Sequence, residues 1–129
     1  MKTTEFNEKR SEYGIEGTGV LSTTREDRTW TNKTTGDQTI IPSGSKVHVW
    51  FSPKVRPDRM FVQYGEFTGI AHTKLASQWL TGFNKAPSMR TLMKNEFNSV
   101  AKSVTGKRVE PDGYGPDGSP SWLLVLGLI

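Results

Sequence analysis

Residues 86–129, APSMRTLMKNEFNSVAKSVTGKRVEPDGYGPDGSPSWLLVLGLI, carry the pattern that decides the fold of this chain. Ser88 is placed to cap a helix that ends at Gly106. The apolar residues of this helix share one stripe that we expect to face the core: Met89, Leu92, Met93, Phe97, Val100, Ala101 and Val104. Two Pro-Asp-Gly turns, at Pro111 and Pro116, then separate a strand at 107–109 from an apolar strand at 122–126. The stretch predicts a helix followed by a C-terminal β-hairpin.

The residues before this stretch predict a short helix preceded by antiparallel β-structure. Residues 73–80 have helical spacing, with Thr73 as N-cap. Residues 46–51 are the clearest strand, with Val47, Val49 and Phe51 on one face and His48 and Trp50 on the other. Further strands are expected at 30–32, 39–41, 60–64 and 67–70, and residues 19–22 are where ordered structure is expected to begin. The turn at 42–45 followed by a strand, a loop and a second strand, up to residue 64, resembles the way small SH3-like barrels are built, although any antiparallel meander of this size produces a similar pattern.

We therefore expect an α+β protein with three parts. Residues 1–18 have few apolar side chains and are interpreted as a flexible N-terminal arm or a loosely docked first strand. Residues 19–72 form the β-rich unit. Residues 73–129 form a helix–helix–hairpin unit, and both units pack as one compact domain.

Composition argues against several kinds of site. The chain has no cysteine, which excludes disulfides, thiolate zinc sites and cysteine nucleophiles. Neither His48 nor His72 has the neighbouring ligand expected of a metal pair, and Asp112 and Asp117 are typical turn residues. Residues 1–19 are polar and mixed in charge, which does not fit a secretory signal, and the apolar run at 122–129 is too short to cross a bilayer. We expect an intracellular, non-enzymatic protein without cofactor, metal or membrane partner.

Charge is concentrated in one part of the chain. Residues 74–108 contain a single acid, Glu96, whereas the whole chain carries a formal net charge of +4. The basic residues of this part are Lys74, Lys85, Arg90, Lys94, Lys102, Lys107 and Arg108. Such a segment is typical of a surface that binds nucleic acid, and it is also typical of the solvated face of an amphipathic helix.

The predicted nucleic-acid contacts divide by side-chain chemistry. On the helix they are Arg90, Lys94, Asn98 and Lys102, and at the hairpin they are Lys107 and Arg108. Arginine and asparagine can form bidentate contacts with bases, whereas lysines mostly contact phosphates.

A second candidate surface combines aromatic and basic residues between positions 50 and 61. Its members are Trp50, Lys54, Arg56, Arg59 and Phe61. They are typical either of a protein-binding or base-stacking surface, or of aromatic residues that pack in the core of a small β-rich unit.

Three segments of the last third resemble the ends of small uncharacterised proteins encoded by tailed bacteriophages and prophages. They are residues 87–92, residues 103–113 and residues 118–129, reading SVTGKRVEPDG and GSPSWLLVLGLI in the latter two. This resemblance implies a phage origin. More distantly, residues 75–80 and 87–92 are similar to the first two helices of phage excisionases and mercury-regulator-type DNA-binding domains, which implies a winged-helix-like arrangement.

We expect a phage-encoded DNA-binding accessory or regulatory protein in the cytoplasm of an infected bacterial host. The alternative is a protein that binds and inhibits a host defence or polymerase component through the surface at 50–61, and a small virion component is a third possibility. The apolar residues 126–129 either insert in the core or cover a partner chain, in which case the protein is a homodimer.

Overall fold

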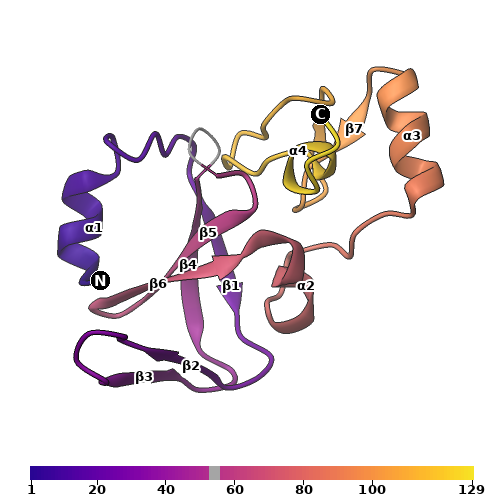
Figure 1. Cartoon of the computed structure of the whole chain (residues 1–129). Coiled ribbons are helices and arrows are strands. Elements are labelled where there is room, and N and C mark those ends of the chain that lie inside the picture. Colours follow the sequence, from indigo (N-terminus) through magenta and orange to yellow (C-terminus); the bar gives the residue numbers. More distant parts are fainter. Residues whose placement is uncertain (53–55) are drawn as a thin grey trace.

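The computed structural model describes residues 1–52 and 56–129 and shows an α+β chain arranged around an antiparallel sheet (Figure 1). The four strands lie in the order β1-β4-β5-β6. Their bounds are Val20–Thr23 for β1, Lys46–Phe51 for β4, Arg59–Tyr64 for β5 and Phe67–His72 for β6. A separate ribbon pairs β2 (Arg28–Thr31) with β3 (Gln38–Ile41). The five expected strands of the β-rich unit are present within a few residues of their predicted bounds, and β1 lies where ordered structure was expected to begin.

The alternation along β4 decides which face of the sheet forms the core. Val47, Val49 and Phe51 are buried on the inner face, where Val49 lies opposite Val62 and Phe51 opposite Met60. This predicted alternation is confirmed. The same core cluster continues into the C-terminal part of the chain through Trp79, Leu80, Phe83, Leu92, Val104, Trp122 and Leu123. Each such side chain stabilises the fold by roughly 1.5–3 kcal/mol through removal of apolar area from water.

The N-terminal residues do not form the expected flexible arm. Thr3–Lys9 is the helix α1, which covers part of the outer face of the sheet (Figure 1). Phe6 is fully buried and packs with Trp50 and Phe61 in a second, smaller cluster. The N–H of Thr3 also donates to the carbonyl of Glu66, beside β6. The burial of Phe6 and the backbone hydrogen bond to Glu66 therefore hold residues 1–9 against the sheet, although their composition indicated mobility.

The two predicted helices are present but shorter than expected. Residues 73–80 form the 3₁₀ turn η1 (Thr73–Leu75) and the helix α2 (Ala76–Trp79). Helix α3 spans Met89–Phe97, and the Ser88 hydroxyl caps it by accepting from the Thr91 N–H, as predicted. Its predicted end at Gly106 is wrong, because Ser99 takes a φ of +54° and reverses the chain. None of the helices formed by the described residues has the length and apolar character that crossing a bilayer requires.

The C-terminal hairpin has different partners from those predicted. Strand β7 (Ala101–Lys102) pairs with β8 (Arg108–Val109), so Lys102 lies on a strand rather than on the helix. The segment predicted as the second hairpin strand is instead the short helix α4 (Trp122–Val125), capped by Ser121, whose hydroxyl accepts from the Leu124 N–H. A short apolar run suits a buried helix as well as a buried strand, and here the serine cap decides between them.

Candidate functional site

Helix α3 presents most of its apolar residues to solvent. Met89, Met93 and Phe97 are 58%, 65% and 89% exposed. They are spaced four residues apart and therefore form a line along the helix, which we call the apolar stripe. The expectation that these residues face the core is wrong, as it is for exposed Val100. Three members of the predicted set are buried as expected: Leu92, Ala101 and Val104.

Two cations lie beside the apolar stripe. Arg90 and Lys94 each stand two residues from buried Leu92, about 200° around the helix, so they point away from the core. Both are exposed, and neither forms an ion pair within residues 1–52 and 56–129. Asn98 is exposed at the C-cap, where its N–H donates to the Lys94 carbonyl at 3.0 Å. The structure thus places Arg90, Lys94 and Asn98 along one exposed side of a single short element.

The hairpin next to α3 adds three more cations. Lys102 lies directly opposite Arg108 across the β7–β8 ladder, and Lys107 precedes Arg108. All three side chains are exposed and have no ion-pair partner in the described part of the chain. Like charges in directly opposed positions of an antiparallel pair are destabilising. Strand β7 and helix α3 are in contact, so the two groups of cations lie on adjoining elements (Figure 1).

A buried polar network fixes the hairpin on the loop before α4. The Thr105 hydroxyl donates to Asp117 Oδ2 at 2.7 Å, and the Ser119 N–H donates to Oδ1 at 3.0 Å. The hydroxyls of buried Ser103 and Ser119 lie 2.8 Å apart. Burial alone raises the pKa of Asp117, but the hydrogen bonds donated by Ser119 and Thr105 outweigh it and hold the pKa below its ordinary value. The sequence identified Asp117 as a turn residue and missed this network, whose members are far apart along the chain.

The loop that carries Asp117 also docks on the segment before β1. The Gly19 N–H donates to the Asp117 carbonyl at 3.1 Å. Gly17 and Gly118 approach so closely that a Cβ on Gly17 would lie 2.5 Å from the Gly118 nitrogen. These contacts attach the unit that bears the cations to the sheet.

An acidic hollow lies near α3 and the β7–β8 hairpin, and Glu96 of α3 is one of the residues that line it. It has a volume of about 640 Å³ and is lined by Glu96, Ser99, Glu110, Pro111, Asp112 and Ile129. Leu128 and Ile129 are exposed, so the expectation that the last residues insert in the core is wrong for these two. That they cover a partner chain stays a prediction. The carboxylates of the hollow limit where a polyanion can lie on this unit.

The second candidate surface is mostly buried. Trp50 and Phe61 are each 8% exposed, because Phe6 of α1 packs over them. The Arg10 guanidinium lies 4.4 Å from the Trp50 ring centre, and His48 stacks on the same ring. These aromatic residues therefore pack in the core, and the prediction that they contact a partner is wrong for this structure.

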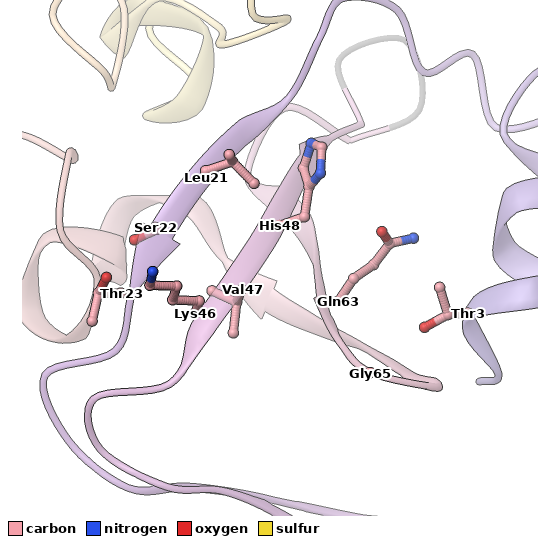
Figure 2. A pocket seen from close by; sticks show the side chains of 9 residues that line it. All are labelled: Thr3, Leu21, Ser22, Thr23, Lys46, Val47, His48, Gln63 and Gly65. Carbon is pink, nitrogen blue, oxygen red and sulfur yellow. The ribbon is translucent and has the colours of Figure 1, made fainter.

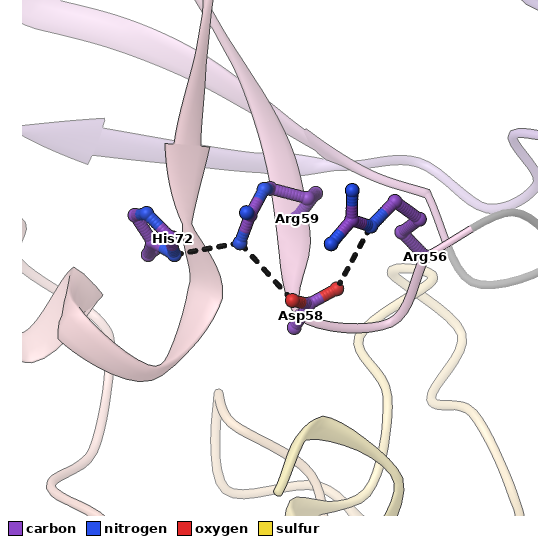
Figure 3. A network of polar contacts seen from close by, with 4 residues as sticks. All are labelled: Arg56, Asp58, Arg59 and His72. Carbon is purple, nitrogen blue, oxygen red and sulfur yellow. Dashed lines mark hydrogen bonds and ion pairs between the residues drawn. The ribbon is translucent and has the colours of Figure 1, made fainter. Parts of the chain in front are cut away.

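The arginines of this second surface are held in an ion-pair network (Figure 3). Asp58 accepts from Arg59 at 3.0 Å and lies 3.5 Å from Arg56 Nε. Arg59 also contacts His72 Nδ1 at 2.6 Å. Lys54, the remaining candidate, lies outside the described residues. Because the Asp58 carboxylate pairs with both guanidinium groups and offsets one of their two positive charges, this network is a weaker site for an anion than the unpaired cations of α3 and β7–β8.

A second hollow, of about 510 Å³, lies on the outer face of the sheet beside α1 (Figure 2). Leu21, Lys46 and His48 project into it from β1 and β4, and Gln63 and Thr3 close its other side. His48 Nε2 lies 3.0 Å from the carbonyl of Thr18. Within the described residues, no group of three or more histidine, aspartate or glutamate side chains is arranged to hold a metal ion.

Comparisons with known proteins do not add a relative. No model of a known protein family matches the chain, and neither a curated protein nor a solved structure matches it.

Proposed function

We propose that the chain is a phage-encoded, non-enzymatic DNA-binding accessory or regulatory protein that uses α3 and the β7–β8 hairpin. The observation that carries the proposal is the set of exposed cations on these elements that have no ion-pair partner among the described residues. The set consists of Arg90, Lys94, Lys102, Lys107 and Arg108.

A polyanion is the ligand that such a surface favours. Unpaired lysine and arginine side chains gain most when they neutralise phosphates and release the condensed counterions. The opposed cations Lys102 and Arg108 repel one another in the free protein, and an intervening phosphate would relieve that repulsion. Arg90 has the paired donors, and Asn98 the donor and acceptor, that bidentate contacts with a base require.

The finer architecture is part of the same proposal. A helix beside a two-stranded hairpin is the combination that winged-helix proteins apply to DNA, and α3 with β7–β8 would serve in that way. The SH3-like description of the sheet, the location in the cytoplasm of an infected host, and a homodimer with half-site symmetry likewise remain proposals.

Charge removal on α3 tests the proposal. In the variant with Arg90→Ala and Lys94→Ala we expect the affinity for DNA to fall, and the slope of log K against log salt to become shallower by about 2. The matched control combines Lys33→Ala and Lys46→Ala, which remove two exposed cations far from α3 in the chain and give the same net charge. Fluorescence anisotropy with labelled DNA measures both. Equal affinities for the two variants would remove the hypothesis.

The second candidate function, binding and inhibition of a host protein, is favoured by a different observation, the exposed apolar stripe of α3. A pull-down from host lysate separates the two functions. Nuclease treatment abolishes capture where DNA is the bridge and leaves it intact for a protein target.

A further inference from the structure

The apolar stripe and the cations of α3 run side by side. Met89, Met93 and Phe97 form one line over about 12 Å of helix, and Arg90 with Lys94 forms the adjoining line over about 6 Å. Phe97 is 89% exposed and has no ring contact with another described residue. Together with Met89 and Met93, which are also exposed, Phe97 forms a contiguous apolar line, and such exposed apolar patches are typical of binding surfaces.

We infer that the ligand of this face is single-stranded nucleic acid, with Phe97 stacking on a base while Arg90 and Lys94 contact the adjacent phosphates. The inference rests on the proposed function and specifies its ligand. A single strand presents unpaired bases along one side and phosphates along the other, which corresponds to the apolar line and the cationic line of α3. A duplex presents its phosphates outward and keeps its bases stacked inside.

Other occupants fit this face less well. A duplex would meet the cations but leave Phe97 and the two methionines in water, unless the ring entered between base pairs, which requires a step to unstack. A second copy of the chain would bring one cationic surface against another. Lys94 and Phe97 are three residues apart and therefore neighbours on the helix, so one nucleotide can contact both.

The chain beyond α3 extends the same surface. After Phe97 the backbone turns at Ser99 into β7, where Lys102 and Arg108 present two more cations. The acidic hollow at Glu96, Glu110 and Asp112 repels phosphate on the opposite flank of the helix. A strand bound along α3 is therefore directed towards the hairpin and away from the hollow.

The test measures binding of a short labelled oligothymidylate and of a duplex of equal length by fluorescence anisotropy. We expect the single strand to bind more tightly than the duplex. Phe97→Ala should weaken single-strand binding roughly 10-fold without changing the salt slope, because stacking involves no counterion release. Lys94→Ala should make the slope shallower by about 0.7.

Conservative variants separate stacking from a general apolar contact. Phe97→Trp should retain single-strand affinity, whereas Phe97→Leu should lose as much as Phe97→Ala, because leucine has no π face. The matched control is Leu21→Ala, which removes another exposed apolar side chain, 81% exposed on β1, and should leave binding unchanged. Circular dichroism confirms that each variant is folded.

The outcomes distinguish this inference from the proposed function. If the wild-type protein binds neither nucleic acid at low salt, both fail. If it binds duplex at least as tightly as the single strand, or if Phe97→Leu or Phe97→Ala binds like wild type, stacking is wrong while DNA binding stands. If duplex binds as tightly as the single strand, or if the Phe97 variants bind like wild type, the apolar stripe is assigned to a protein partner.

Discussion

Asp117 is the residue on which the position of the hairpin depends. Its carboxylate accepts hydrogen bonds from Thr105 and Ser119, and its backbone carbonyl accepts from Gly19. One side chain thereby joins the turn of β7–β8 to the loop before α4, and its main chain joins that loop to the segment preceding the sheet. These contacts of Asp117 include none of the proposed ligand-binding residues.

Removing this charge should destabilise the fold and alter its response to acid. Because the pKa of folded Asp117 lies below the ordinary 3.8, its contribution is present above that pH and is lost as the pH falls through the folded pKa. Asp117→Asn should lower the free energy of unfolding at neutral pH by about 1–2 kcal/mol, since an amide accepts weaker bonds than a carboxylate.

Urea unfolding measured at neutral pH and at about pH 3 checks this expectation. The variant should lose less stability on acidification than the wild type does. Identical acid dependence of the two proteins would show that the ionised carboxylate of Asp117 does not stabilise the fold. Asp37→Asn, at an exposed turn, is the matched control.

The β7–β8 hairpin carries a conflict between stability and binding. Lys102 and Arg108 face one another as like charges, although an acid at either position would form a cross-strand pair. Arg108→Glu should therefore stabilise the protein by about 0.5 kcal/mol and at the same time weaken DNA binding. Thermal unfolding and anisotropy on the same sample measure the two effects. If these cations are only solvated, Arg108→Glu would stabilise the protein and leave its DNA affinity unchanged.

The elements differ in how far the sequence predicts them. Strand β4 alternates Val47, Val49 and Phe51 with His48 and Trp50, so its position and buried face follow from periodicity. The end of α3 does not, because Val100, Ala101 and Val104 continue the helical spacing while the chain has already turned at Ser99. The helix α1 was missed because a single apolar residue, Phe6, anchors it.

The candidate site shows the same division. The sequence identified Arg90, Lys94, Lys102 and Arg108 as exposed cations, and all four are exposed. It did not reveal that Trp50 and Phe61 lie beneath α1, because that contact joins residues more than forty positions apart. The exposure of Phe97 was equally hidden, since its spacing on the helix is that of a core residue.

Across the whole molecule, two aromatic residues on the outer face of the sheet are covered by α1, whereas the apolar stripe of α3 is exposed to solvent. Helix α1 covers part of the outer face of the sheet (Figure 1), and its Phe6 packs on Trp50 and Phe61. One core cluster extends from the sheet to Trp122 of α4. Helix α3 is joined to this core through Leu92 and leaves its opposite side free. Unpaired cations and exposed apolar side chains therefore gather on the same unit.

The dependence of DNA affinity on salt concentration decides whether those cations bind phosphate. If the five cations of α3 and β7–β8 each neutralise one phosphate, the slope of log K against log salt is about −3.5 for a single strand and about −4.5 for a duplex. A slope near zero, or the absence of binding at low salt, would contradict a nucleic-acid function for this surface.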